Sequence, residues 1–424
     1  MNFIGPKSII EKRKEYLFPS TAHFYKDPPQ MVKGSMQYLF DQNNKKYVDF
    51  FAGVSVMNCG HSNPKILENT IEQLNNLQHT TIIYLTQPMV LLAEKLAEVL
   101  PGDIKRTFFC VSGSEANEGA MALARLYTKK NGFIALNGGL HGRTHLTLSV
   151  TGIPMWRLDN DLIKDNIFFI DRPYSDDSTD EAAMKNSLEQ LENILKAHGN
   201  NICAMLVEPI QGNGGIIMYP PNYLKKVKRL LEAYNVLLIT DEVQTGYGRT
   251  GKMFCIEHYD VVPDIMVTGK ALGNGIPIST FSTTDEIAKA YNRASASTFG
   301  GNPVAAQTAL SVLNYIDENN LVKKSKELGE YLKKKLEQLS YPFIKEVRGC
   351  GLMLGMQIEA LDESMASPDL VDTILEEMKD RGFIIGKNGM GRNVLAFQPP
   401  LVISKKDIDN MIINLEEVFE KLTF

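Results

Sequence analysis

The fold is decided by Val236-Leu-Leu-Ile-Thr240-Asp241-Glu242-Val-Gln244, a short apolar run that ends in carboxylates. A run of this length and composition is typical of a strand buried on both faces of a sheet. A second apolar run, Ile265–Thr268, is followed closely by Lys270. Because ligands of open α/β sheets bind at the carboxyl ends of the strands, the sequence places Asp241 and Lys270 at a ligand-binding edge.

The region around these runs predicts the fold class. Helical patterns such as Met89–Leu100 alternate with short apolar runs between about residues 65 and 310. The runs are Arg106–Val111, Phe133–Leu136, Ile167–Ile170, Ala204–Val207, Val236–Thr240 and Ile265–Thr268. This alternation predicts an α/β fold whose mainly parallel sheet is covered by helices on both faces.

The two ends of the chain predict a second, smaller unit. Alternating runs on either side of Asp41-Gln-Asn-Asn44 predict a hairpin at 37–49. A long helical pattern from Ala305 through Leu339 precedes a strand at Val347–Ile358 and a terminal amphipathic helix at Lys405–Leu422. We therefore expect an N-terminal arm and part of the small domain at 1–60, a large domain at 61–310 and a C-terminal small domain at 311–424.

Composition excludes several function classes. The 424 residues are 44% apolar and 22% charged, with a net charge of −5, so there is no basic footprint for nucleic acid. No stretch approaches the roughly 18 apolar residues that span a bilayer, and the first residues contain no signal peptide, so we expect no membrane partner and a cytoplasmic location. The five cysteines lack any Cys-x-x-Cys spacing, which argues against a disulfide framework and a metal site.

An acid and an amine at strand ends match the needs of pyridoxal phosphate. The ring nitrogen of this cofactor stays protonated beside a buried carboxylate, and a lysine holds the cofactor as an imine until substrate arrives. Asp241 fits the first role and Lys270 the second. Each residue alone has an ordinary alternative, a helix cap for Asp241 and a solvated surface amine for Lys270, but their joint context favours the cofactor site.

Four further loops contain candidate binding residues. Ser112-Gly113-Ser114-Glu115 opens a helix, where Gly113 permits a tight turn, Ser114 is expected to cap, and the first amides form an anion site suited to a phosphate; an ordinary capping box is the alternative. Arg143, between His141 and Thr144, is a candidate cation for a substrate anion. The loop after Glu208 and the loop at Ser297-Thr298 are weaker signals, and plain turns are their alternative.

Together these segments resemble the class III family of pyridoxal-phosphate-dependent aminotransferases, which has fold type I and includes acetylornithine, ornithine, 4-aminobutyrate and alanine–glyoxylate aminotransferases. The resemblance runs from Tyr38 through nearly the whole chain. Its motifs are His-Gly-Arg-Thr at 141–144, Glu-Pro-Ile-Gln-Gly at 208–212, Asp-Glu-Val-Gln-Thr-Gly at 241–246, Gly-Lys-Ala-Leu-Gly-Asn-Gly at 269–275 and Pro-Pro-Leu-Val-Ile at 399–403. It implies a seven-stranded, mainly parallel sheet between helices, and a smaller α+β domain formed by the N- and C-terminal segments.

The resemblance also implies roles for individual residues. Lys270 would form the internal aldimine and shuttle the proton, Asp241 would pair with the pyridinium, and Gln244 would bond the ring phenolate oxygen. An obligate homodimer with shared active sites is implied, because Thr298 would reach the phosphate of the partner's cofactor. The cofactor-binding set implied as a whole is Ser112, Gly113, Ser114, Leu140, His141, Glu208, Asp241, Gln244, Lys270 and Thr298.

Three departures from the family pattern concern the cofactor and the substrate. Leu140 stands where relatives place an aromatic residue against the cofactor. Ala396 stands where many relatives have an arginine that clamps the substrate carboxylate, and Asn213 stands where they have the glutamate that pairs with it. Both members of the pair are absent together, which avoids an unpaired buried charge. We expect anion recognition through Arg143, or a substrate other than those of the main relatives, such as pyruvate, glyoxylate or a phosphonate-bearing amine.

The expected function is amino transfer from an amine or amino acid to a small oxo acid by a ping-pong mechanism. A lyase that expels a hydroxyl or phosphate from an amino-alcohol, phosphonate or phosphate substrate, or an epimerase, remains an alternative on the same scaffold. A non-enzymatic pyridoxal-binding regulator is disfavoured, because the chain retains Lys270 and has no appended nucleic-acid-binding segment.

Overall fold

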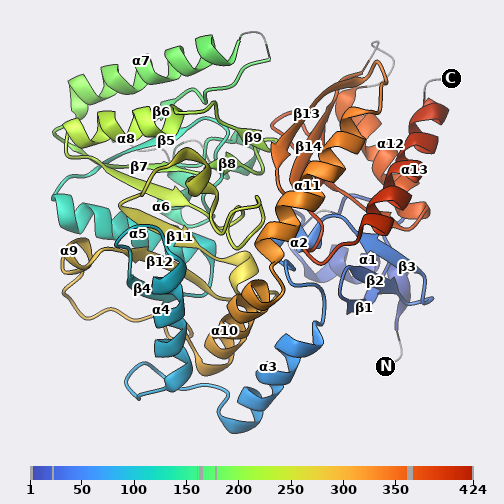
Figure 1. The fold of residues 1–424 in the computed structure, drawn as a ribbon, viewed down its shortest axis with the longest axis horizontal. Helices are drawn as coiled ribbons and strands as arrows, with labels where there is room; N and C mark the ends of the chain where they lie inside the picture. Colours follow the sequence, from blue (N-terminus) through green and yellow to red (C-terminus); the bar gives the residue numbers. More distant parts are fainter. Residues whose placement is uncertain are drawn as a thin grey trace.

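The computed structural model describes residues 3–21, 23–159, 161, 166–176, 179–360 and 366–422. At its centre lies a seven-stranded sheet of order β4-β12-β11-β10-β7-β5-β6, in which β12 runs antiparallel to both neighbours and the other pairs are parallel (Figure 1). The strands are β4 (Arg106–Cys110), β5 (Gly132–Leu136), β6 (Ile167–Ile170), β7 (Ile202–Val207), β10 (Leu237–Asp241), β11 (Ile265–Thr268) and β12 (Ser279–Thr283). The predicted α/β class and mainly parallel seven-stranded sheet are confirmed.

Both faces of this sheet are buried. Alternate residues of one strand lie in two different apolar clusters, one on each face. Ala204 and Leu206 of β7 pack in the cluster that contains the inner face of α5. Met205 and Val207 pack in the other, larger cluster. The helices of this part of the chain are α3 (Pro64–Asn76), α4 (Gln87–Val99), α5 (Gly113–Thr128), α6 (His145–Ser149), α7 (Asp180–His198), α8 (Tyr223–Ala233), α9 (Asp285–Ala288) and α10 (Pro303–Glu318). Continuous apolar strands are the expected consequence of this two-sided cover.

Two predicted elements are wrong in their extent. The helical pattern at 305–339 forms two helices, α10 and α11 (Leu321–Glu337), because Asn320 adopts a φ of 52° and ends the first run. The predicted strand at 347–358 forms a hairpin of β13 (Ile344–Cys350) and β14 (Met353–Ile358), which turns at Gly351 with a φ of 55°. In both places a residue in the left-handed region interrupts the regular element.

The N- and C-terminal parts of the chain build two smaller sheets. One has the order β13-β14-β17-β16, with β16 (Gly386–Asn388) and β17 (Val394–Phe397). The other has the order β1-β2-β3-β15, with β1 (Met31–Ser35), β2 (Tyr38–Asp41), β3 (Lys46–Asp49) and β15 (Phe383–Ile384). The remaining elements are α1 (Gly5–Tyr16), α12 (Ser367–Asp380), α13 (Lys405–Leu422) and two short strands, β8 (Ile210–Gln211) and β9 (Ile217–Met218).

The N-terminal arm packs with the C-terminal part, as predicted. The hairpin of β2 and β3 has the register Tyr38↔Val48, and β15 joins β3 in parallel through Phe383↔Val48. Figure 1 shows this blue sheet beside the red helices α12 and α13. The division of the chain at residues 60 and 310 stays a prediction. Among the described residues, no helix combines the length and apolar character that crossing a membrane requires.

The turn that follows β3 has an uncommon backbone. All four residues of α2 (Ala52–Ser55) have positive φ, of 50°, 61°, 68° and 58° in order. Left-handed turns of this kind cost roughly 1–2 kcal/mol per non-glycine residue. Asp49 holds the turn, since one carboxylate oxygen accepts the N–H groups of Phe51 at 2.8 Å and Ala52 at 2.9 Å and the other lies 2.6 Å from His61 Nε2. The chain leaves this turn at Val56.

Candidate active site

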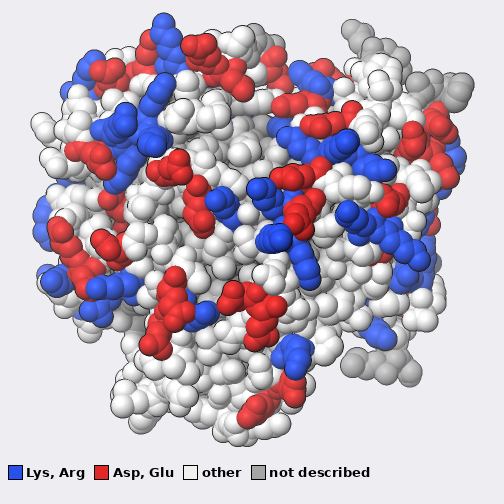
Figure 2. Space-filling view, in the orientation of Figure 1, with Lys and Arg blue, Asp and Glu red and all other residues white. Residues whose placement is uncertain are grey.

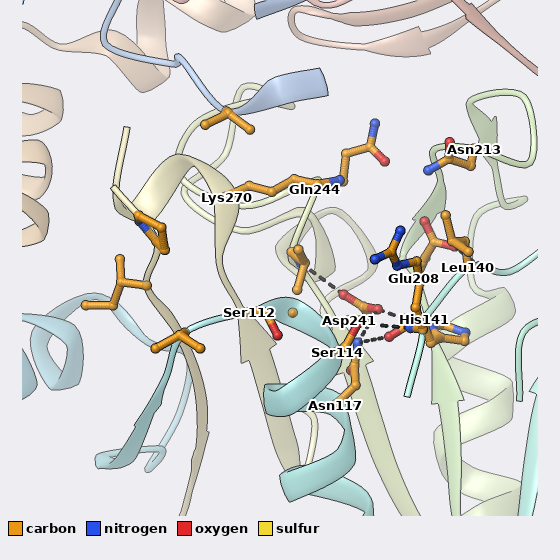
Figure 3. A pocket seen from close by; sticks show the side chains of 18 of the residues that line it. Ser112, Ser114, Asn117, Leu140, His141, Glu208, Asn213, Asp241, Gln244 and Lys270 are labelled. Atoms are coloured by element: carbon orange, nitrogen blue, oxygen red, sulfur yellow. Dashed lines mark hydrogen bonds and ion pairs between the residues drawn. The ribbon is translucent and has the colours of Figure 1, made fainter. Parts of the chain in front are cut away.

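A cavity of about 400 Å³ lies where β7, β10 and β11 end and α5 begins. Figure 3 shows its side chains converging from these elements. The residues singled out from the sequence that line it are Ser112, Gly113, Ser114, Leu140, His141, Arg143, Glu208, Asn213, Asp241, Gln244 and Lys270. The sheet therefore brings residues from five separate segments of the chain to one site.

Asp241 is the fixed anion of the cavity. Its Oδ2 atom accepts a hydrogen bond from Asn117 Nδ2 at 2.8 Å and lies 2.9 Å from His141 Nδ1, and its Oδ1 atom accepts the N–H of Val243 at 3.1 Å. The residue is 4% exposed. A buried carboxylate needs partners of this kind, because desolvation of an unpaired charge is costly. The contacts fix the position and orientation of the carboxylate.

Lys270 is the free amine of the cavity. It follows β11, opens the short helix η4 (Lys270–Leu272) and has a φ of 44°, a strained backbone of the type found at functional sites. No described residue forms an ion pair or hydrogen bond with its Nζ atom. Burial lowers the pKa of the Lys270 amine, while the charges of Asp241 and Glu208 oppose this effect. A lysine with a lowered pKa is a better nucleophile and base near neutral pH.

The start of α5 lies in the cavity wall, where an anion site was predicted, and one predicted contact there is wrong. The cap is Ser112, whose Oγ accepts the N–H of Glu115 at 3.2 Å, and not Ser114. Ser114 Oγ instead accepts the N–H of Arg143 at 2.9 Å, which ties the two loops together. The first turn of a helix leaves backbone N–H groups without intrahelical acceptors, so these amides are available to an anion.

Glu208 joins two loops of the cavity wall. It follows β7, and its two oxygens accept the N–H groups of Leu140 at 2.7 Å and Gly212 at 3.0 Å. The side chain is buried, and this burial raises the pKa of Glu208 to about 7. Its contacts hold the backbone of Leu140 and the Asn213 loop at fixed positions around the cavity.

The side chains of Arg143 and Asn213, like the Lys270 amine, have no hydrogen-bond or ion-pair partner among the described residues. Arg143 is exposed, and Asn213 is half-buried. Ala396 lies away from the cavity lining, in β17, where it pairs with Gly355 and Gly386 in the neighbouring strands. Of the described residues that line the cavity, Arg143 is thus the one cation without an ion-pair partner besides Lys270.

The structure does not bring Thr298 into this cavity. The residue is exposed, in the loop between α9 and α10, and is absent from the cavity lining of its own chain. A role for Thr298 therefore depends on a second copy of the chain.

Sequence reasoning missed several residues of the cavity. Asn117, Val56 and Trp156 all line it. Asn117 could have been found, since it is a polar residue beside Ala116 on the buried face of α5 and three residues after Ser114. Val56 and Trp156 carry no such signal, because their positions depend on chain reversals outside the sheet.

Comparison with known proteins identifies the family. The sequence profile of the class III aminotransferases matches residues 24–419. The chain belongs to the class III aminotransferase family. These enzymes depend on pyridoxal phosphate.

Relatives align along almost the whole chain. Acetylornithine aminotransferase of Methanocaldococcus jannaschii is 40% identical and covers 93% of this chain and 94% of its own. Alanine–glyoxylate aminotransferase 2 homolog 2 of Arabidopsis thaliana is 37% identical, with 99% and 89% covered. Leucine/methionine racemase of Thermococcus litoralis is 35% identical, with 97% and 95% covered. Relatives at this level of identity therefore include both aminotransferases and a racemase.

Solved structures have the same fold. An (S)-enantioselective omega-transaminase from Thermomicrobium roseum superposes with a TM-score of 0.91 at 28% identity over 100% of both chains. A phospholyase from Arthrobacter in complex with phosphoethanolamine gives 0.89 at 30% identity over 97% and 99%. An omega-transaminase from Pseudomonas jessenii in complex with PMP gives 0.90 at 27% identity over 97% and 98%.

The raised pKa of Glu208 predicts a pH-dependent stability. The folded protein binds the proton of Glu208 more tightly than the unfolded chain, whose glutamates titrate near 4.5. This contribution is complete below pH 4.5 and is lost as the pH rises toward 7, by up to roughly 3 kcal/mol. The stability difference between Glu208→Gln and wild type should therefore shift in favour of the variant between pH 4.5 and 7, measured by denaturant unfolding of cofactor-free protein.

The exposed Glu337→Gln is the matched control and should follow the wild-type profile at every pH. Parallel profiles for wild type and Glu208→Gln would contradict the assignment, whatever the constant offset between them.

Proposed function

We propose that the protein is a pyridoxal-phosphate-dependent aminotransferase that moves an amino group from an amine or amino acid donor to a small oxo acid in two half-reactions. One observation carries this proposal: the unpaired amine of Lys270 and the fixed carboxylate of Asp241 share one cavity. Amine and carboxylate are the two groups that this cofactor requires of the protein.

The residues present fit the cofactor. Ser112, Gly113 and Ser114 at the start of α5 supply amides and hydroxyls for the phosphate. Gly113 belongs to a tight cradle, because a methyl group there would lie 3.1 Å from Val243 Cγ1. Asp241 would bond the ring nitrogen and Gln244 the ring oxygen. Leu140 and His141 line the same cavity and would border the ring.

The chemistry divides between cofactor and protein. Pyridoxal phosphate, when bound, supplies an electron sink for the carbon that bears the amino group. Lys270 Nζ takes the proton from that carbon and later returns it, a role that its lowered pKa supports. Asp241 keeps a proton on the ring nitrogen, since its fixed carboxylate stabilises the positive charge there.

Arg143 would recognise the acidic group of the substrate. It is exposed at the cavity and no described carboxylate pairs with it. Ala396 leaves no second cation in β17, and Asn213 adds a neutral amide to the wall. Donor and acceptor would therefore present their acidic groups to the same arginine in turn. This arrangement favours small oxo acids such as pyruvate or glyoxylate.

A lyase or epimerase is the second candidate. Relatives of similar identity include a leucine/methionine racemase and a phospholyase. The absence of the Arg/Glu pair at positions 396 and 213 favours this reading, because an enzyme with a single substrate has no need to alternate between two differently charged ones.

The active form would be a homodimer. The loop between α3 and α4 exposes Ile83, Tyr84 and Leu85, by 81%, 66% and 101%. Figure 2 shows few charged side chains over this loop, whereas acidic and basic groups alternate over much of the same face. Apolar surface of this extent is typical of a contact with another chain. Phe299, beside Thr298, is also exposed, by 59%, and its ring centroid lies 5.0 Å from that of His79 in the loop between α3 and α4.

Half-reaction spectroscopy tests the reaction type. A donor amine alone should abolish the visible absorbance of the bound cofactor, and a small oxo acid should restore it. Lys270→Ala should slow the change by about 100-fold or more, because it removes the general base, whereas the exposed Lys252→Ala should not. Ammonia release without any oxo acid would instead establish the lyase.

Replacement of Arg143 tests the substrate anion. Arg143→Met should raise KM for an anionic substrate by roughly 10- to 100-fold, as expected for loss of a charge-assisted hydrogen bond, and change kcat little. Arg143→Lys, which keeps the positive charge, should raise KM less than Arg143→Met does. Arg229→Met, on the surface of α8, is the control. An unchanged KM in Arg143→Met would remove this residue from the site.

Subunit mixing tests the shared site. Lys270→Ala and Thr298→Val proteins are unfolded together, refolded together and assayed at a limiting cofactor concentration. If Thr298 serves the partner's site, each mixed dimer contains one intact site and the mixture exceeds the mean activity of the two parents. If Thr298 serves its own site or none, the mixture equals that mean.

A further inference from the structure

Gln398 lies directly behind the cavity, in a backbone that is anchored on both sides. It follows β17, and its own N–H donates to Phe50 O at 2.7 Å. The carbonyl of the next residue, Pro399, accepts a hydrogen bond from the fully buried Arg249 at 2.6 Å. The side chain of Gln398 is itself fully buried. The backbone that carries this amide is therefore held in place.

This amide contacts a residue of the cavity. Gln244 Nε2 donates to Gln398 Oε1 at 3.4 Å, and Gln244 lines the cavity. The Nε2 atom of Gln398 has no partner among the described residues although it is buried. A primary amide has two N–H groups, so the bond to Gln398 leaves one N–H of Gln244 for a ligand.

Gly212 confines the side-chain amide of Gln244 from another side. A methyl group on Gly212 would lie 2.2 Å from Gln244 Oε1 and 2.5 Å from its Cδ atom. The N–H of Gly212 is in turn bound by Glu208. The Gln244 amide thus lies between the backbone of Gly212 and the acceptor oxygen of Gln398. Gln244 and Lys270 line the same cavity, and both are labelled in Figure 3.

We propose that Gln398 is a positioning residue that turns the Gln244 amide so that its second N–H, rather than its oxygen, faces the ring oxygen of bound pyridoxal phosphate. The proposal rests on the proposed function, because it needs the cofactor in the cavity. The acceptor of Gln398 distinguishes the two orientations of the Gln244 amide, since only one of them places an N–H against it. The opposite orientation would set two oxygens against each other.

A hydrogen bond to the ring oxygen stabilises its negative charge, so it lowers the pH at which the bound cofactor changes its visible spectrum. Loss of the positioning contact should raise that pH. Gln398 thereby sets the protonation of the cofactor through Gln244 without touching it.

The test is a spectroscopic pH titration of the holoenzyme in wild type, Gln398→Met, Gln244→Met and the double variant. Gln398→Met should raise the midpoint by roughly 0.5 to 1 pH unit, as expected for one weakened hydrogen bond. In the Gln244→Met background the same change should add nothing, because the two residues act in series. Gly212→Ala, which displaces the Gln244 amide from the other side, should shift the midpoint in the same direction.

Leu401→Met is the matched control for altered packing behind the Pro399-Pro400 pair, and its midpoint should equal that of wild type. An unshifted midpoint in Gln398→Met, or an equal shift with and without Gln244, would overturn the positioning role while leaving the proposed function intact. A wild-type protein that binds no pyridoxal phosphate would overturn both.

Discussion

The parallel pairing of β10 with β11 is the constraint on which the rest of the site depends. Its register sets Asp241 opposite Val267, and the N–H of Glu242 bonds to the carbonyl of Val267 at 2.8 Å. The carboxylate and the amine of Lys270 then leave the sheet at the same edge. A slip of one residue would turn Asp241 toward the opposite face, because side chains alternate along a strand. Burial on both faces excludes such a slip, since polar side chains would enter the core.

The sequence predicted the parts of the fold that apolar runs define. It missed β12, whose residues Ser279–Thr283 are mostly hydroxylic and yet buried throughout. The hydroxyls explain this burial, because Ser279 donates to Ser112 O at 2.7 Å and Thr283 to Asp264 O at 2.6 Å. A strand of this kind is stable only beside those partners, because buried hydroxyls need hydrogen-bond partners. Its composition alone predicts a loop. The break at Asn320 was missed for a related reason, since it interrupts an otherwise continuous helical pattern.

The candidate site divides in the same way. Lys270, Asp241 and the loops at 112–114 and 141–143 were predictable, since each lies near the end of a strand or the start of a helix. Gln398 and Val56 were not, because the turn at 52–55 brings Val56 to the cavity and the end of β17 brings Gln398 against Gln244 behind it. The proposed cofactor-binding residues thus come from motifs, whereas the residues packed behind and around them come from tertiary contacts.

The left-handed turn at Ala52–Ser55 limits how this cavity can diverge. Every residue of the turn must accept positive φ, a condition that Gly, Asn and Asp meet most easily and β-branched residues meet least. Natural variation and random libraries should therefore find few folded solutions inside the turn. Side-chain size can vary more freely at Val56, where the chain has left it. The backbone of residues 52–55 is therefore constrained, whereas the side chain at position 56 can change, and new substrate preferences would arise there.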